Sequence, residues 1–346
     1  MKKIILSILL MVMVASFLQA ETKLKMEIWN RWSYQTIDGE NTKNEMALKR
    51  GYLRLEPVLG SNIKGRFNVD FFSDDGAGDG AGLKIKYAYL DFSNILPIQD
   101  AKFTAGLMKT YFGTIYEWDY TTIDKDPTDK YKFAASVDYG MGVSGYLPEG
   151  YGNYAVAVYN GEGYKKSGGL INNSMSVVAN MRVTPITGIT VGGSYMLNSK
   201  NDKDELDDAG LLIREDINQM AGVTKLAFGD FSLLGQYLSK TVSYEAALDD
   251  VTTTAISLLP TYKLNNSIDL VTRYDIYDPN TDADDDGYNT IVAGFNYHLM
   301  RDSKNKPKLF LQANYQIKQY EDESKDDVND LMVQLRWIFS ETINKK

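Results

Sequence analysis

The chain has 346 residues, of which 44% are hydrophobic, 24% charged and 12% aromatic, and it contains no cysteine. This composition excludes a disordered chain and a disulfide-stabilised scaffold, and the length suits one large all-β domain or two smaller ones. The formal net charge of -9 offers no basic surface for phosphate backbones, which argues against nucleic-acid binding.

Residues 1–20 differ from the rest of the chain. Lys2 and Lys3 precede an apolar run that begins at Ile4 and ends near Ala20, which is the pattern of a secretory signal peptide. We therefore predict export and a mature domain that covers residues 21–339. No later apolar run reaches about 18 residues, so we expect no membrane-spanning helix.

Segments in which every second residue is apolar recur along the whole mature sequence. In residues 173–197, for example, Met175, Val177, Met181 and Val183 alternate with mostly polar residues. Each segment has roughly nine to eleven residues, the length that a tilted strand needs to cross a bilayer. The clearest of about sixteen segments are residues 24–32, 62–72, 101–108, 136–146, 231–238, 267–277, 289–299 and 330–339.

The connections between these segments alternate in length. Even-numbered connections are short turns such as PITG (residues 185–188), whereas odd-numbered ones are long and polar, above all residues 110–131 and 198–218. Long outer loops and short periplasmic turns are typical of outer-membrane barrels. We therefore predict an all-β fold, a 16-stranded antiparallel transmembrane β-barrel, in which the third loop, residues 110–131, constricts the channel.

Basic residues fall on the polar side of the alternation. A Lys or Arg that faced lipid at mid-depth would cost roughly 2 to 4 kcal/mol, so we expect these residues to face a water-filled interior. For any single arginine, pairing with an inward aspartate as a strut of the wall is an equally good interpretation. The residues that we predict to line the pore and attract anions are Arg31, Arg54, Arg66, Lys109, Arg182, Arg273 and Arg336.

The predicted constriction loop is acidic. Negative charge at the narrowest point of a channel would repel a multivalent anion, so this loop argues against a phosphate site. Only Lys125 and Lys130 offset the acidic residues of the loop, which are Glu117, Asp119, Asp124, Asp126 and Asp129.

Metal-binding and catalytic motifs are weak. Asp282, Asp284 and Asp286 match the start of a calcium-binding loop, but Ala293 stands where the motif requires a glutamate. We interpret the segment as an acidic solvated loop, with calcium binding as the alternative. The single histidine, His298, has no G-x-S-x-G serine motif to act with, so we expect neither enzyme activity nor a cofactor.

Seven short motifs follow one another along the chain. They are GLMKTYFG (residues 106–113), DYGMGVSG (138–145), YAVAVYNGEG (154–163), LLGQYL (233–238), IDLVTRYD (268–275), IVAGFNYHL (291–299) and LMVQLRWIF (331–339). In this order they resemble the phosphate-selective porins of Gram-negative outer membranes. The resemblance implies a trimeric channel in which basic side chains guide anions past the third loop. Lys109, Arg273 and Arg336 match basic residues of that family.

We therefore predict an outer-membrane porin that passes small hydrophilic solutes and ions by passive diffusion, with a preference for anions or phosphate as a further hypothesis. We expect a homotrimer in contact with outer-membrane lipid and lipopolysaccharide. The alternative is a non-conducting barrel or surface adhesin that binds a partner through its loops. Residues 340–346 follow the aromatic end of the last segment, Phe339, and we expect them to form a tail outside the barrel.

Overall fold

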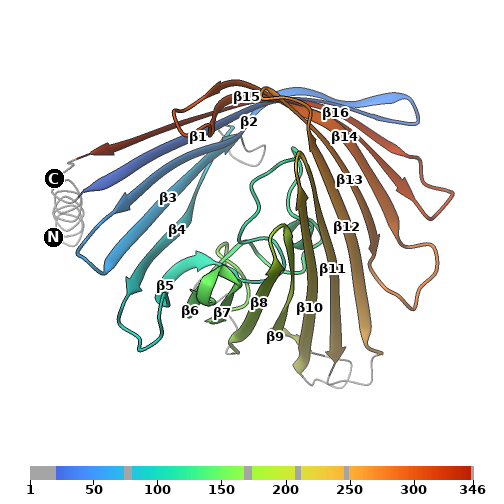
Figure 1. Ribbon diagram of the computed structural model, residues 1–346. Helices are drawn as coiled ribbons and strands as arrows, with labels where there is room; N and C mark the ends of the chain where they lie inside the picture. The colour runs from blue at the N-terminus through green and yellow to red at the C-terminus, as the bar shows by residue number, and fades with distance from the viewer. Residues whose placement is uncertain (1–20, 74–79, 167–173, 207–211, 245–248, 344–346) are drawn as a thin grey trace, which may run out of the picture.

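The strands close into a single ring. The computed structural model describes residues 21–73, 80–166, 174–206, 212–244 and 249–343. Each strand pairs antiparallel with its neighbours in sequence, and β1 closes the barrel against β16 (Figure 1). The predicted 16-stranded barrel is therefore confirmed. The predicted signal peptide lies outside the described residues.

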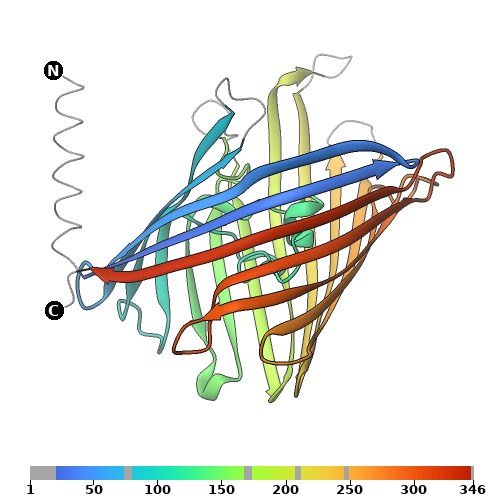
Figure 2. The ribbon, with the colours of Figure 1, turned by 90° about the horizontal axis from the view of Figure 1, so that it is seen from above.

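The strands of the wall are steeply tilted relative to the barrel axis (Figure 2). No helix in the described part of the chain is long and apolar enough to span a membrane. The elements are β1 (Thr22–Ile37), β2 (Glu40–Pro57), β3 (Ile63–Ser73), β4 (Ala81–Ser93), β5 (Lys102–Lys109), α2 (Pro127–Lys130), β6 (Val137–Tyr146), the 3-10 helix η1 (Pro148–Gly150), β7 (Gly152–Tyr159), β8 (Ser176–Ile186), β9 (Ile189–Leu206), β10 (Leu212–Phe228), β11 (Phe231–Tyr244), β12 (Val251–Lys263), β13 (Ile268–Asp278), β14 (Tyr288–Arg301), β15 (Pro307–Tyr320) and β16 (Val328–Ile343).

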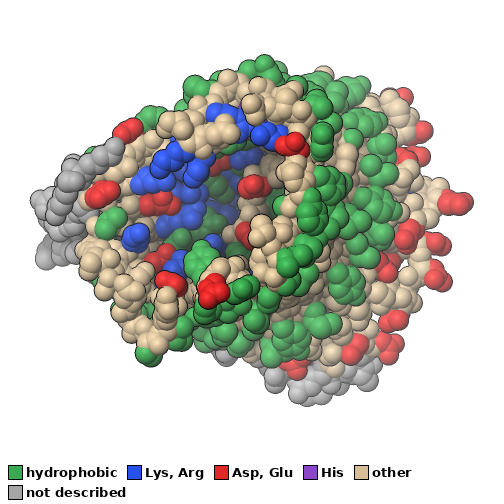
Figure 3. Space-filling model, in the orientation of Figure 1, with side chains coloured by type: hydrophobic (Ala, Val, Ile, Leu, Met, Phe, Trp, Pro, Cys, Tyr) green, Lys and Arg blue, Asp and Glu red, His purple; other side chains and the backbone are tan. Residues whose placement is uncertain are grey.

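Alternation decides which side of each strand faces outward. On β8, Val177 and Met181 are 42% and 50% exposed, whereas Val178 and Arg182 on the other side are 0% and 1% exposed. The same alternation is found on other strands, so hydrophobic side chains cover the outer wall (Figure 3). An apolar surface of this extent requires lipid, because water-soluble monomers expose only small apolar patches.

The two ends of the barrel carry different connections. At the end where Thr22 and Ile343 pair, neighbouring strands are joined by short turns such as residues 187–188 and 229–230. The opposite end, which we call the outer end, carries the longest connection, residues 110–136. This difference agrees with short periplasmic turns and longer outer loops.

Two of the predicted outer loops are mostly strand. Only Asp38 and Gly39 separate β1 from β2, and their φ angles of 48° and 75° match the tight turn that the twist of a hairpin favours. The fifth loop, expected over residues 198–218, is shortened because β9 and β10 extend well into it. The polar residues of these two connections extend the strands beyond the apolar wall and do not form long loops.

The last strand is longer than the sequence indicated. We expected residues 340–346 to leave the barrel after Phe339, but β16 continues to Ile343. Residues 340–343 pair with the beginning of β1. Unpaired backbone groups at a strand edge are unfavourable in a membrane, so this extension supplies β1 with a partner along its full length. Residues 344–346 lie outside the described chain.

Outward positions of β8 provide a test of which face meets lipid. We expect Met181→Lys to lower the free energy of unfolding in lipid vesicles by about 2 to 4 kcal/mol, because the lysine would face hydrocarbon. Ile186→Lys, beside the turn at residues 187–188, places the same charge near the membrane surface and should cost about 0 to 1 kcal/mol. Urea titrations followed by tryptophan fluorescence measure both losses, and equal losses would contradict the assignment.

Candidate functional site

Residues 110–136, which join β5 to β6, fold into the barrel (Figures 1 and 2). We call this segment the inner loop; it contains α2 and the predicted constriction loop, residues 110–131. Its contacts reach strands on the far side of the ring. The Ile123 N–H, for example, donates to the side-chain oxygen of Asn314 on β15 at 2.6 Å. The inner loop therefore crosses the interior and narrows it.

An apolar core joins the inner loop to the inner wall of the barrel. Phe112 and Phe133 of the loop are 0% and 1% exposed, and they belong to one cluster with Val178 on β8 and Leu238 on β11. Small wall residues such as Ala157 leave room for the aromatic rings of the loop. Burying a side chain of this size stabilises by about 1.5 to 3 kcal/mol, so the loop is packed like a core segment.

Four of the seven predicted basic residues bind the backbone of the inner loop. The contacts are Arg182 Nη2 with Gly113 O at 2.6 Å, Arg273 Nη1 with Lys125 O at 2.7 Å, Arg336 Nη1 with Tyr120 O at 3.1 Å, and Arg31 Nη2 with Ile123 O at 3.3 Å. Arg182 and Arg273 are each 1% exposed. The four side chains hold the loop in place, and the three buried ones, Arg182, Arg273 and Arg336, contribute little surface to a solute path.

Side-chain amides supply further partners for the loop backbone. The amide nitrogens donate to loop carbonyl oxygens: Gln219 to Phe133 O at 2.6 Å, Asn296 to Thr121 O at 3.0 Å and Gln312 to Tyr120 O at 3.0 Å. A buried carbonyl left without a partner costs about 1 to 3 kcal/mol, so these amides matter to the position of the loop. We did not identify them from the sequence, where their only signal is an inward polar position on a strand.

Tyr120 fixes the tip of the inner loop. Arg50 donates to its hydroxyl at 3.0 Å, and the ring of Trp29 meets the ring of Tyr120 edge-on, with centres 4.6 Å apart. Arg50 also lies 4.1 Å from the centre of the Trp29 ring, a cation–π contact worth about 0.5 to 2 kcal/mol. Tyr120 has a φ angle of 59°, a left-handed conformation that tyrosine rarely adopts.

Two of the acidic residues of the inner loop form ion pairs. Glu117 lies 2.6 Å from the ammonium group of Lys225, and Asp124 lies 2.7 Å from that of Lys130. Burial favours the neutral form of Asp124, but Lys130 and Arg273 outweigh it and hold its pKa at about 2. The side chain of Asp119 accepts a hydrogen bond from Thr121 at 2.9 Å. The loop is thus less negative towards a solute than its composition indicates.

Asp126 has a structural role in the inner loop. It caps α2 by accepting from the Thr128 N–H at 2.8 Å, and it is 2% exposed. The Thr114 hydroxyl lies 2.5 Å from both Asp126 Oδ2 and Gln236 Oε1, but it has only one proton to donate. A protonated Asp126 completes this network by donating to Thr114. Burial raises the pKa of Asp126 to about 6, although the hydrogen bonds with Thr114 and Thr128 lower it.

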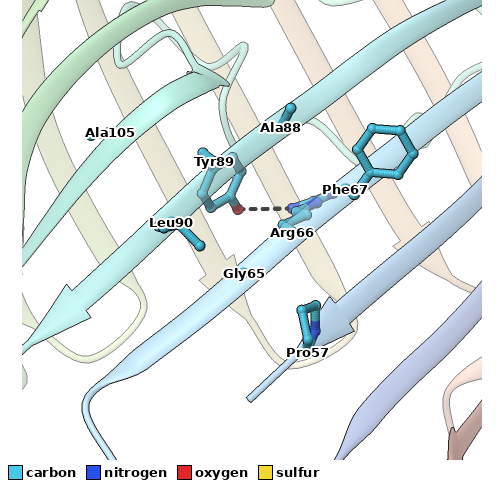
Figure 4. Close-up of a pocket in the computed structure, with 8 residues that line it drawn as sticks. All are labelled: Pro57, Gly65, Arg66, Phe67, Ala88, Tyr89, Leu90 and Ala105. Atoms are coloured by element: carbon cyan, nitrogen blue, oxygen red, sulfur yellow. Dashed lines mark hydrogen bonds between the residues drawn. The ribbon is translucent and has the colours of Figure 1, made fainter. Parts of the chain in front are cut away.

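The other three predicted basic residues do not bind the loop backbone. Arg66 contacts Tyr89 on the neighbouring strand at 3.4 Å (Figure 4) and lies 4.2 Å from the centre of the Tyr87 ring. Arg54 donates to the side chain of Asn68 at 3.0 Å. Lys109 lies over the rings of Tyr111 and Tyr116, at 5.8 Å and 5.5 Å. These residues stand on β2, β3 and β5, and Figure 3 shows Lys and Arg side chains gathered inside the barrel.

Two hollows lie on opposite sides of the inner loop. The outer cavity, about 670 Å³, is bounded by the loop, residues 161–166 of the connection after β7, and the inner faces of β2 to β4 and of β8 to β11. A second hollow of about 320 Å³ lies towards the turns and is lined by residues that include Lys102, Lys109 and Glu117. A solute that crossed the barrel would pass from one hollow to the other beside the inner loop.

The remaining candidate residues form no reactive cluster. No group of three or more His, Cys, Asp or Glu in the described residues is arranged to hold a metal ion. Calcium binding by Asp282, Asp284 and Asp286 stays a prediction. His298 lies 2.6 Å from the carboxylate of Asp269, with its ring centre 5.6 Å from that of Phe310. These contacts fit a histidine that is part of the wall.

No protein-family profile matches the sequence, and neither does any curated protein. Solved structures do match. OprB of Pseudomonas putida is 10% identical, with a TM-score of 0.64 over 95% of this chain and 96% of that one. The anion-selective porin from Comamonas acidovorans is 14% identical, with a TM-score of 0.62 over 92% of this chain and 99% of that one. The trimer form of OmpT, an outer membrane protein of Vibrio cholerae, is 13% identical, with a TM-score of 0.62 over 92% of this chain and 99% of that one. This likeness to outer-membrane barrels shows the fold alone.

The buried pair between Arg273 and Asp275 tests how firmly the inner loop is anchored. Both side chains are 0% exposed and their charged atoms are 2.7 Å apart. We expect Arg273→Met to lower the free energy of unfolding by about 3 kcal/mol, because it leaves a buried carboxylate and frees Lys125 O. The double variant Arg273→Met with Asp275→Leu should recover part of this loss. Urea titrations measure both, and a single variant as stable as the native protein would contradict the anchoring role.

The pKa of Asp126 predicts a dependence of stability on pH. Because folding raises this pKa from 3.8 to about 6, the folded state binds the proton more tightly. The resulting stabilisation, about 3 kcal/mol, is complete below pH 3.8 and is lost as the pH rises through 6. Asp126→Asn keeps both hydrogen bonds without a titrating group. The difference in unfolding free energy between the two proteins should therefore change between pH 4 and pH 7, and a constant difference would refute this account.

Proposed function

We propose that this protein is an outer-membrane porin, a water-filled channel through which small hydrophilic solutes and ions diffuse passively. The observation that carries the proposal is the combination of an apolar outer wall with a charged interior that a well-anchored inner loop narrows. A loop fixed in this way sets the size and charge of the passage without closing it.

A mild preference for anions is part of the proposal. Arg54, Arg66 and Lys109 are free of the loop backbone and stand on one side of the passage, where Glu56 lies 3.8 Å and 3.9 Å from the two arginines. The loop carboxylate beside Lys109, Glu117, is paired with Lys225. Cations on walls of low dielectric focus a positive field into the channel. The shared fold with a porin named as anion-selective is in keeping with this preference.

We further propose that the protein is exported by residues 1–20, lies in the cell outer membrane and assembles as a homotrimer. The fold similarity to a trimeric form of OmpT supports the assembly. The apolar wall would then contact lipid, lipopolysaccharide and neighbouring subunits. We propose no enzyme activity, since the sequence contains no G-x-S-x-G serine motif to act with His298.

Planar-bilayer recordings test the channel and its selectivity together. The purified protein should give ohmic conductance, and under a salt gradient its reversal potential should indicate a modest anion preference. Arg66→Glu should shift that potential towards cation selectivity, because it reverses a charge inside the barrel. Arg301→Glu, at the end of β14 beside an exposed turn, makes the same charge change away from the passage and should shift it much less.

Absence of conductance would overturn the channel and favour the alternative of a closed barrel that binds a partner through its loops. Conductance with clear cation selectivity would overturn the anion preference alone.

A further inference from the structure

The outer cavity has an excess of positive charge. Eight Lys or Arg residues line it against five Asp or Glu residues. Six of the basic residues are lysines that form no salt bridge with any carboxylate in the described part of the chain: Lys84, Lys86, Lys125, Lys132, Lys165 and Lys166. Unpaired cations that line a concave, low-dielectric surface attract anions strongly.

Two of the five carboxylates of the lining have close partners other than these lysines. Asp70 lies 4.0 Å from Arg50, and Asp138 accepts the backbone N–H groups of Tyr139 and Gly161 at 2.7 Å and 2.8 Å. None of these contacts involves the six lysines. With eight basic and five acidic residues, the lining keeps an excess of positive charge.

Local backbone geometry directs two of the lysines into the cavity. The register between β3 and β4 shifts beside Asn68, and this bulge places Lys86 and Tyr87 on the inner side in succession. Lys86 is only 7% exposed, and its ammonium group binds the Ser136 hydroxyl of the inner loop. The ammonium group of Lys86 also lies 4.2 Å from the centre of the Tyr164 ring.

Lys132 is exposed on the inner loop and has a φ angle of 58°. Lysine seldom adopts this left-handed conformation, and such outliers persist only where the surrounding structure imposes them. The loop thus turns a lysine towards the cavity at a cost in backbone energy. The bulge at Lys86 and the turn at Lys132 are independent features that add to the same charged surface.

We propose that the outer cavity is a capture site for extended organic polyanions before they pass the inner loop. This inference rests on the proposed function, because it presupposes a solute path through the barrel. The lysines come from three separate segments, which are β4, the inner loop and residues 160–166. A compact anion bonds only to donors within about 3 Å of its oxygens, whereas an extended anion presents charges to donors on several segments.

The size and chemistry of the cavity agree with this ligand class. Its volume of about 670 Å³ lies within the range of sites for ligands larger than a single phosphate. Lysine offers a mobile point charge where arginine offers a rigid fork, so the site attracts negative charge without fixing one orientation. A channel needs such binding, strong enough for entry and weak enough for release.

Block of the channel current tests the site. In planar bilayers, adenosine triphosphate is added without divalent cations to one side at a time, with inorganic phosphate and uncharged adenosine as comparators. We expect adenosine triphosphate to reduce the current from the outer side at about a tenfold lower concentration than inorganic phosphate, and adenosine to have no effect. The block should weaken as salt concentration rises, because the charges are exposed to water.

Two variants locate the site. Lys165→Gln with Lys166→Gln removes two exposed charges from a connection, and Lys84→Gln with Lys86→Gln removes two from β4; each pair should weaken the block about threefold to tenfold. Lys64→Gln, an exposed lysine at the other end of β3, serves as the matched control and should leave the block unchanged.

The outcomes separate the two proposals. A channel that conducts salt but is not blocked by adenosine triphosphate would overturn the capture site and leave the porin proposal standing. Equal block by inorganic phosphate would overturn the requirement for an extended anion. Equal weakening by Lys64→Gln would assign the block to the general field of the barrel. A protein that does not conduct would overturn the proposed function itself.

Discussion

A chain segment that crosses the inside of a barrel must find partners for its backbone, and the rest of this structure depends on how the inner loop meets that requirement. Strands satisfy one another through the sheet, but an irregular loop cannot. Here Arg182, Arg273 and Gln312 reach inward from the wall and donate to loop carbonyls. The wall is therefore specific to this loop, and the loop takes its path from side chains that lie far away in the sequence.

This requirement redistributes the charges inside the barrel. Arginines that anchor the loop are buried and contribute little to the field that a solute meets, whereas Arg66 and Lys109 remain beside the passage. The loop carboxylates are offset in the same way, since Glu117 and Asp124 have lysine partners. Formal net charge is consequently a poor guide to selectivity, and the position of each charge relative to the loop decides its effect.

The sequence predicted the barrel well because alternation of side chains along a strand is a local property. It correctly placed Val177 and Met181 outside and Arg182 inside. It did not predict the anchoring role of Arg182 or the amide of Gln312, since both depend on contacts between segments that are distant in sequence. The extension of β16 to Ile343 was missed for a similar reason: pairing with β1 decides it, and the local pattern does not.

The contacts also divide the interior into two unequal parts. On β6 and β7 most inward residues are small, and Ala155 and Ala157 belong to one cluster with Phe112 and Phe133 of the loop, so the aromatic residues pack against this side. On β2 to β4 the inward residues are long and basic, as Arg54, Arg66 and Lys84 illustrate. The outer cavity reaches these strands, whereas the second hollow is lined in part by Ser144 on β6 and Asn153 on β7. The basic residues that stay clear of the loop backbone thus come from β2, β3 and β5, and buried arginines such as Arg182 on β8 and Arg273 on β13 keep the inner loop in position.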